Sequence, residues 1–217
     1  MKNMKKYLSL LIALLLIGSA FGQDDKAKAI LDKVSAKTNA YKSVIISFDL
    51  TITGPSMDSP ITESGKAFLE GDKYKVELAD QDIYCDGVTM STHLKVDKEC
   101  YSSKVAEAEA EDMIMPSELL TIWEDGYKYQ YIKETTYKGV AVHHINLFPK
   151  DPAKSKFTAI ILKIDKEKNE VVSVLIKGKD GMNMKYDLTK LEKNVAIPAS
   201  TFVFDRAKHP DVECYDE

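Results

Sequence analysis

The stretch VIISFDLTIT, residues 44–53, determines the fold class of this chain. Apolar side chains recur there at every second position, as at Ile46, Phe48 and Leu50, and mostly polar residues such as Asp49 stand between them. Because successive side chains of a strand point to opposite faces, this pattern predicts a β-strand with one apolar face. That face requires a core to cover it.

Similar short segments follow, and turn signals separate them. Gly71-Asp72 ends one of them, and Asp86-Gly87 is a strong hairpin signal. The strands that we predict in this first meander are Ile61 to Glu70, Lys73 to Ala79, Ile83 to Cys85, Val88 to Lys95 and Glu99 to Ser102. Turns this short join antiparallel neighbours.

Between Ser103 and Asp125 the strand pattern stops. Residues 104–112 are rich in alanine and glutamate, which favour a helix, and Pro116 suits the first turn of a second one. This segment carries the apolar residues Met113, Met115, Leu119, Leu120 and Trp123. They either plug the opening of a curved sheet or complete a permanent core, and composition by itself favours the core.

Strand patterns resume after residue 127 and form a second meander. Its predicted strands are Lys128 to Thr135, Gly139 to Phe148, Phe157 to Asp165, Val171 to Gly178, Met182 to Leu188 and Ser200 to Phe204. A sheet of about eleven strands tends to curl, and helices then cover the apolar face that it encloses. We therefore predict a mainly β chain: one domain, residues 23–217, with a long, curved antiparallel sheet and a few short helices.

Upstream of the first strand, residues 24–41 predict an amphipathic helix. Ala27, Ile30, Leu31 and Val34 recur at spacings of three and four, with charged residues between them. This helix supplies one apolar face to cover the sheet.

Residues 1–22 have the three parts of a secretory signal peptide. Three lysines precede an apolar run from Tyr7 to Ile17, and Ala20 and Gly22 stand at the positions before a cut ahead of Gln23. The apolar run is shorter than the roughly 20 residues of a membrane-spanning helix, which weighs against the alternative of a retained anchor. We expect export and cleavage, which place the mature chain outside the cytoplasm.

Loss of the three lysines changes the formal net charge from −4 to −7. An acidic surface argues against nucleic acid as a partner. Of the three cysteines, Cys85 and Cys100 are the nearest in sequence, but we expect them two strands apart. Twice the ~4.8 Å strand spacing is too far for a disulfide, so unpaired and mostly buried thiols are preferred.

Catalytic signatures are poor. The sequence contains no G-x-S-x-G, Walker loop, H-E-x-x-H or C-x-x-C motif. His143 and His144 fall within one predicted strand, where neighbours point to opposite faces and do not chelate one metal together. We expect no metal, no cofactor and no enzyme activity. The alternative is a catalytic group of residues that are distant in the sequence and are brought together by the fold.

Several short motifs follow one another in a recognisable order: AILDKVS at 29–35, GKAF at 65–68, KYKV at 73–76, LFPK at 147–150, the Asp180-Gly181 turn and the residues from Asn194 to Phe204. Together with the order of the predicted segments, they resemble the LolA family, periplasmic carriers of outer-membrane lipoproteins. The resemblance covers nearly all of residues 23–217, its ending looks most like members from Bacteroidota, and it implies a periplasmic location.

The resemblance implies an incomplete, half-open β-barrel whose concave space holds lipoprotein acyl chains under a helical lid. The implied cavity residues are Phe48, Leu50, Phe68, Tyr74, Val76, Leu78, Met90, Ile145 and Leu147. The implied lid residues are Met113, Met115, Leu119, Leu120 and Trp123. Lys75 stands where the family often has an arginine that tethers the lid, so a weaker or differently wired tether is expected.

The resemblance also implies partners and leaves alternatives open. The expected partners are acylated lipoproteins and an inner-membrane lipoprotein-releasing ABC transporter, met in transient contacts at the membrane by a monomeric carrier. The alternatives are a carrier of glycolipids or other lipids, and a ligand sensor built on the same half-barrel.

Overall fold

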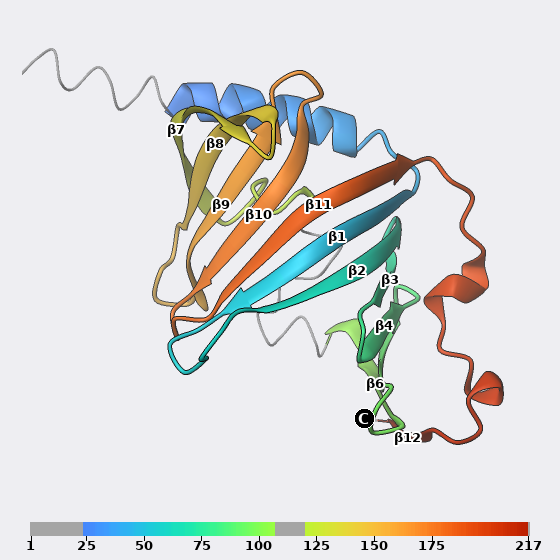
Figure 1. The fold of residues 1–217 in the computed structure, drawn as a ribbon. Coiled ribbons are helices and arrows are strands. Elements are labelled where there is room, and N and C mark those ends of the chain that lie inside the picture. The colour runs from blue at the N-terminus through green and yellow to red at the C-terminus, as the bar shows by residue number, and fades with distance from the viewer. Residues whose placement is uncertain (1–23, 107–119, 217) are drawn as a thin grey trace, which may run out of the picture.

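One sheet dominates the computed structural model, which describes residues 24–106 and 120–216 (Figure 1). Its strands are β1 (Val44–Thr53), β2 (Ile61–Glu70), β3 (Lys73–Glu77), β4 (Gln81–Cys85), β5 (Thr89–Leu94), β6 (Glu99–Lys104), β7 (Tyr127–Tyr137), β8 (Val140–Pro149), β9 (Phe157–Asp165), β10 (Glu170–Gly178), β11 (Asn183–Lys193) and β12 (Glu213–Asp216). Two 3₁₀ turns, η2 (Ala199–Phe202) and η3 (Arg206–Lys208), precede β12.

The strand order is β12-β6-β5-β4-β3-β2-β1-β11-β10-β9-β8-β7. Two antiparallel meanders are therefore joined side by side through the β1–β11 pair. Strands β7 and β12 stand at the two ends of this order and are not paired with each other, so the described sheet is open. The predicted half-open β-barrel is confirmed, with twelve strands where about eleven were expected.

The local sequence explains the turns that hold this order. At the β4–β5 hairpin the Asp86 carboxylate accepts hydrogen bonds from the backbone N–H groups of Val88 and Thr89, at 2.9 and 2.8 Å. Gly87 adopts a φ of +93°, a conformation that glycine enters at little cost. The hairpin predicted from Asp86-Gly87 is confirmed.

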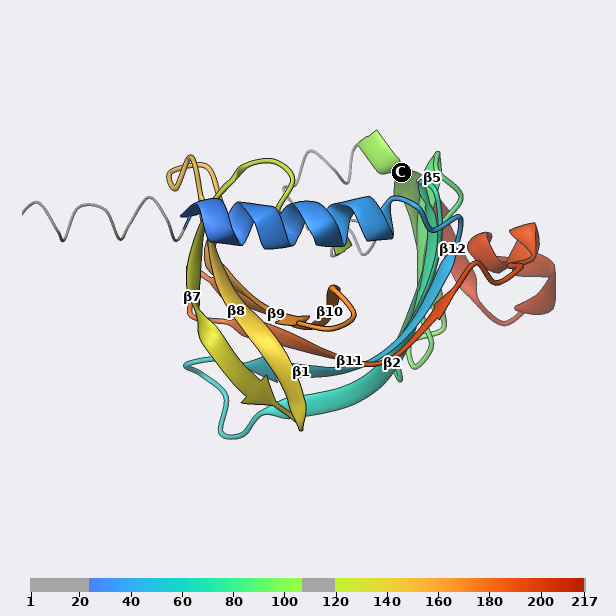
Figure 2. The same cartoon turned by 90° about the horizontal axis from the view of Figure 1, so that it is seen from above.

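The helix of residues 24–38 lies across the hollow of the curved sheet (Figure 2). Its apolar stripe packs on the concave face of the second meander, against Ile160, Leu162 and Val174 among others. The stripe consists of Ala27, Ile30, Leu31 and Val34, as the spacing predicts. This half of the concave face is thus a permanent core.

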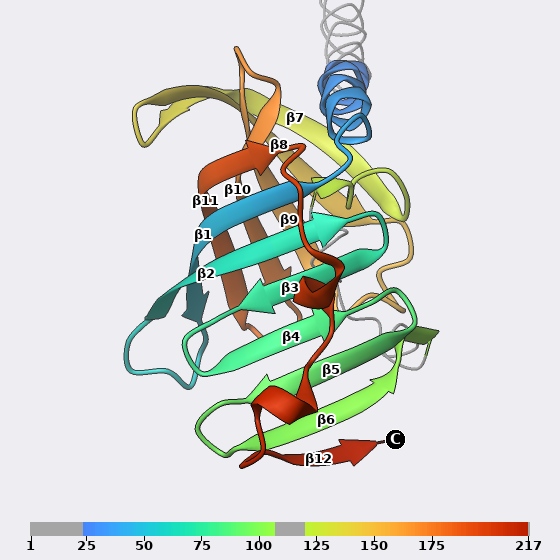
Figure 3. The ribbon, with the colours of Figure 1, turned by 90° about the vertical axis from the view of Figure 1, so that its right-hand side faces the viewer.

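The other half of the concave face, mainly on β1–β4, carries a second apolar cluster that includes Phe48, Tyr74 and Val76. On the convex side, the chain after β11 runs back across the outside of the first meander (Figure 3). Phe202 and Phe204, 1% and 8% exposed, are buried there. Both faces of the first meander are therefore covered in part.

Two predictions near the C-terminus are wrong. The predicted strand Ser200 to Phe204 is a 3₁₀ turn over Ala199–Phe202, followed by extended residues that join no ladder. Strand β12 was not predicted, and it pairs parallel with β6 although all strands were expected to be antiparallel. Its sequence, ECYD, lacks an apolar alternation, so its strand conformation depends on the partner strand.

Other boundaries differ slightly. The first helix ends at residue 38 rather than 41, and a turn at residues 39–40 and a bend at residue 42 follow before β1. Most of the predicted helices between 104 and 125 lie outside the described residues. Within the described ranges, no helix combines the length and the hydropathy that a membrane crossing requires.

Candidate functional site: an apolar cavity

A cavity of about 300 Å³ opens on the concave face beside the helix-covered core. Fifteen of its 17 lining residues are apolar or aromatic, and the exceptions are Glu63 and Gln81. The lining residues are Ile46, Phe48, Leu50, Ile52, Glu63, Ala67, Tyr74, Val76, Leu78, Gln81, Ile83, Met90, Leu120, Val174, Met184, Tyr186 and Leu188. The cavity is therefore suited to an apolar ligand.

The floor of the cavity is formed by the side chains that point to the concave face from β1 and β11. In the antiparallel β1–β11 pair, Phe48 lies opposite Leu188 and Leu50 lies opposite Tyr186. Directly opposed residues of a ladder share a face, so the apolar rows of both strands line the same surface. The rings of Phe48 and Tyr186 meet edge to face with their centroids 5.6 Å apart. This contact fixes both rings in the floor.

Gly65 gives Phe48 the room that it needs. The two residues are register partners in the β1–β2 ladder. A Cβ atom at Gly65 would stand 2.5 Å from Cζ of Phe48 and 2.8 Å from Cδ2 of Leu78. Any larger residue there must push one of these side chains aside, so Gly65 helps to set the shape of the cavity.

A few polar groups border the cavity. Tyr74 donates a hydrogen bond to Sδ of Met90 at 3.3 Å. Burial, and then the nearby Glu63 carboxylate, raise the pKa of Tyr186, so its hydroxyl stays protonated at neutral pH. Glu63, Leu78 and Gln81 also line a neighbouring pocket of about 400 Å³ that includes Asp80 and Asp97. The apolar cavity thus borders a more polar pocket.

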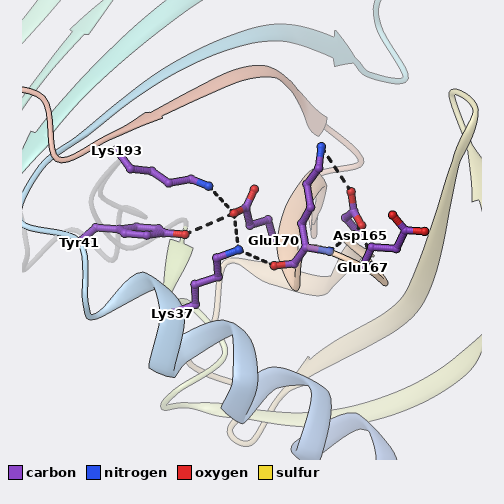
Figure 4. Close-up of polar contacts among 7 residues, drawn as sticks. Lys37, Tyr41, Asp165, Glu167, Glu170 and Lys193 are labelled. Carbon is purple, nitrogen blue, oxygen red and sulfur yellow. Dashed lines mark hydrogen bonds and ion pairs between the residues drawn. The ribbon is translucent and has the colours of Figure 1, made fainter.

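The C-terminal end of the helix that closes the adjacent core is tied to the sheet by the Glu170 carboxylate. Glu170 lies 2.6 Å from Nζ of Lys37, contacts Nζ of Lys193 and accepts a hydrogen bond from the Tyr41 hydroxyl (Figure 4). Burial opposes ionisation of Glu170, but hydrogen bonds and charges from Lys193 and Lys37 outweigh it and lower the pKa of this carboxyl. The helix end is therefore held by a charged cluster as well as by apolar contacts.

Six of the nine predicted cavity residues line the cavity: Phe48, Leu50, Tyr74, Val76, Leu78 and Met90. Phe68 does not, because it lies next to Ala67 in β2 and so points to the convex face, opposite Lys75. Ile145 and Leu147 are on the concave face but are fully buried in the core under the helix. The apolar helix stripe occupies the space that they would otherwise line.

The predicted lid residues divide in the same way. Met113, Met115 and Leu119 lie outside the described residues. Leu120 lines the cavity and is 7% exposed. Trp123 instead packs in the helix-covered core, where its indole N–H donates to Oγ of Ser35 at 2.8 Å.

Lys75, the predicted lid tether, lies on the face of β3 that is turned away from the cavity, and its role as a tether stays a prediction. Tyr74 and Val76 face the cavity, so Lys75 between them points to the convex face. Its ammonium group lies 2.7 Å from Oε1 of Glu77 and 4.7 Å from the centroid of the Tyr84 ring. Its described contacts are therefore on the convex face and not in the cavity.

The sequence analysis missed ten lining residues, and eight of these are apolar or aromatic. All eight lie on strands that the prediction had already placed. Some of these missed residues follow from strand alternation alone, because every second residue of a strand shares a face. Ile46 and Ile52 lie on the same face of β1 as Phe48, and Tyr186 lies on the same face of β11 as Met184 and Leu188. Others, such as Val174 of β10, carry no signal that separates them from the core.

The histidine pair behaves as the alternation predicts. His143 lies beside the Tyr131 ring on the concave side, and His144 contacts Oδ1 of Asn146 at 3.0 Å on the other side. Among residues 24–106 and 120–216, no cluster of three or more His, Cys, Asp or Glu side chains is arranged to hold a metal ion.

Comparison with known proteins places the fold. No protein-family model and no curated protein matches this sequence. An uncharacterized conserved protein from Thermus thermophilus matches with a TM-score of 0.57 and 9% identity, over 88% of this chain and 99% of that one. The lipoprotein LppX of Mycobacterium tuberculosis matches with a TM-score of 0.50 and 15% identity, over 79% of this chain and 98% of that one.

The chain shares their fold. A LolA superfamily protein from Nitrosomonas europaea is a further neighbour, at a TM-score of 0.43 and 10% identity, over 82% of this chain and 97% of that one. At these identities the likeness is one of architecture.

Proposed function

We propose that this protein is a periplasmic carrier that shields the acyl chains of lipoproteins and moves them from the inner to the outer membrane. The observation that carries the proposal is the apolar cavity on the concave face of an open half-barrel. In this proposal the chain is a binding protein and not an enzyme, and residues 1–22 direct its export.

The energetics support a shielding role. Each CH₂ group removed from water contributes about 0.8 kcal/mol, so an acyl chain of about 15 such groups gains on the order of 10 kcal/mol on entering an apolar site. An acylated protein does not cross an aqueous compartment at a useful rate without such a site. The cavity supplies it with Phe48, Leu50 and Leu188 in its floor.

The position of the cavity also fits. Its volume is at the lower end of the range for small-ligand sites, so it encloses part of one acyl chain. The polar pocket that shares Glu63, Leu78 and Gln81 with it gives the hydrophilic part of the ligand a place beside the mouth. The proposed donor is an inner-membrane lipoprotein-releasing ABC transporter, which the carrier meets transiently as a monomer.

The test is release of an acylated lipoprotein from inner-membrane vesicles. We expect the purified protein to keep the lipoprotein in the supernatant after the vesicles are sedimented. The variant Leu188→Lys places a charge in the cavity floor and should reduce the soluble lipoprotein at least about tenfold. The matched control Thr189→Lys places the same charge on the next, exposed residue of β11 and should behave as the wild type.

The proposal fails if the wild-type protein retains no lipoprotein, or if both lysine variants retain as much as the wild type. Mass spectrometry of lipids that copurify with the protein gives a second readout. Glycolipids or other free lipids in place of lipoprotein acyl chains would assign the cavity to a different cargo.

A further inference from the structure

The C-terminal segment is held against the outside of the first meander by a small apolar cluster. Phe204 packs edge to face on Tyr84, with ring centroids 5.6 Å apart, and stacks on His209 at 5.0 Å. Val212 and Cys214 complete the cluster around Tyr84, Cys100 and Phe204. This segment then ends as β12 along the free edge of β6 (Figure 3).

Strand β12 has little else to hold it. It is four residues long, and two of its side chains contact other residues. Tyr215 stacks on Tyr101, with ring centroids 5.2 Å apart, and Asp216 pairs with Arg206. Three of its four residues are exposed. An exposed ion pair contributes about 0–1 kcal/mol, so a strand of this kind opens easily without a further connection.

Cys100 and Cys214 are placed for that connection. They are register partners in the parallel β6–β12 pair, so both side chains point to the convex face. Neighbouring strands are about 4.8 Å apart, which lies within the Cα–Cα range of roughly 4.4–6.8 Å for disulfides. Cys214 packs against the buried cluster that contains Cys100. Cys85 packs in the cavity-side cluster, on the other face of the sheet.

We propose that Cys100 and Cys214 form a disulfide that fastens β12 to β6 in the exported protein. This inference uses the oxidising compartment that the proposed periplasmic location provides, and it does not depend on the nature of the cargo. It assigns Cys100 and Cys214 as a redox-modified pair, while Cys85 stays a thiol.

The chemistry is a dithiol–disulfide exchange with an oxidant that carries a disulfide, either a protein oxidase or oxidised glutathione. The Cys214 thiolate attacks one sulfur of that disulfide and forms a mixed disulfide, and the oxidant's other sulfur leaves as a thiol. Cys100 then attacks Sγ of Cys214 and expels the oxidant's remaining thiol. The two cysteines lose two electrons and two protons, and the oxidant gains both.

Exposure fixes the order of the two steps. Cys214 is half-buried and reachable, whereas Cys100 is fully buried, and burial followed by the neighbouring Cys214 sulfur raises the pKa of the Cys100 thiol to about 11. The exposed thiol therefore meets the oxidant first. The resulting bond holds the C-terminal segment behind β3 and β4, whose opposite face carries Tyr74, Val76 and Ile83 of the cavity wall.

The test compares reduced and oxidised forms of the purified full-length protein. After oxidised glutathione is added, we expect a mass loss of two hydrogen atoms and a single linked peptide pair that contains Cys100 and Cys214. Cys85→Ala should form the same link, and Cys214→Ser should leave Cys100 unlinked. Hydrogen exchange at the amides of residues 213–216 should slow by about tenfold or more on oxidation, and a reductant should reverse it.

A link between Cys85 and Cys100, a mixed glutathione disulfide on Cys214 that never resolves, or unchanged exchange in β12 would overturn the proposal. The experiment contains no lipid or lipoprotein. Its failure therefore leaves the carrier function untouched, and failure of the lipoprotein assay leaves the disulfide intact.

Discussion

Asp187 of β11 should supply a large share of this protein's resistance to acid. The side chain is 4% exposed on the convex face, where the Tyr137 hydroxyl donates to it at 2.6 Å. Lys138 and Lys185 lie 3.0 and 3.3 Å from its carboxylate. Burial alone would raise the pKa of this carboxyl, but the hydrogen bonds from these groups and from Ser173 lower it to about 2.

The lowered pKa of Asp187 determines how much this carboxylate stabilises the fold and over which pH range. The folded pKa of about 2 lies below the ordinary value of 3.8, so the unfolded chain binds the proton more readily. At 1.36 kcal/mol per pKa unit, the ionised carboxylate contributes about 2 kcal/mol to the free energy of unfolding above pH 4. That stabilisation is lost as the pH falls from about 4 to about 2.

We therefore expect Asp187→Asn to lower the free energy of unfolding by about 2 kcal/mol or more at pH 7, because the amide also leaves Tyr137 and the two lysines with a weaker partner. Urea denaturation at a series of pH values measures the effect. The variant should lose less stability than the wild type between pH 4 and pH 2. The exposed Asp58→Asn serves as the control and should change the free energy by less than about 0.5 kcal/mol.

The reasoning is refuted if Asp187→Asn matches the wild type at pH 7, or if both proteins lose stability in parallel below pH 4. Either result would mean that the carboxylate is not ionised and bonded in the folded state. Its contacts with the β7–β8 hairpin would then not stabilise the fold.

Three further perturbations follow from the same contacts. Leu31→Ala should lower the free energy of unfolding by about 3 kcal/mol in urea denaturation, because the side chain is 2% exposed in the helix-covered core; a loss under about 1 kcal/mol would show that the helix is not part of it. Gly65→Val should force the Phe48 ring into the cavity and weaken binding of a fluorescent fatty acid by about tenfold, while an unchanged affinity would place the ligand elsewhere. Glu170→Gln should destabilise the protein by about 2 kcal/mol at pH 7, since Lys37 and Lys193 lose their counter-charge. This difference should vanish once the pH falls below the depressed pKa of the wild-type carboxyl, and a pH-independent difference would rule out the charged cluster as its cause.

Local patterns predicted the regular part of the fold because their causes are local. The alternation in residues 44–53 gives β1, and the turn chemistry of Asp86-Gly87 gives the β4–β5 hairpin. The bounds of β2 and β9 agree with the prediction to the residue. Strand β12 could not be found in this way, because ECYD forms a strand only where the edge of β6 offers backbone partners.

The candidate site was predictable only in part, because alternation separates two faces without saying which is concave. Phe68 was assigned to the cavity and Lys75 to the lid tether, but the curvature of the sheet turns both side chains outward. Ile145 and Leu147 do face inward, and a helix far away in the sequence covers them. Both outcomes depend on contacts between segments that are distant along the chain.

By itself, the sequence determined an open antiparallel sheet with an amphipathic helix, a pair of separated thiols at Cys85 and Cys100, and one apolar face along each strand. These follow from side-chain period and turn chemistry, which act over a few residues. Only the tertiary structure decided which half of the concave face stays hollow, and that Cys214 lies beside Cys100. The physical reason is burial: the helix stripe fills the hollow over β7–β10, and the remaining apolar surface on β1–β4 and β11 is left as the cavity.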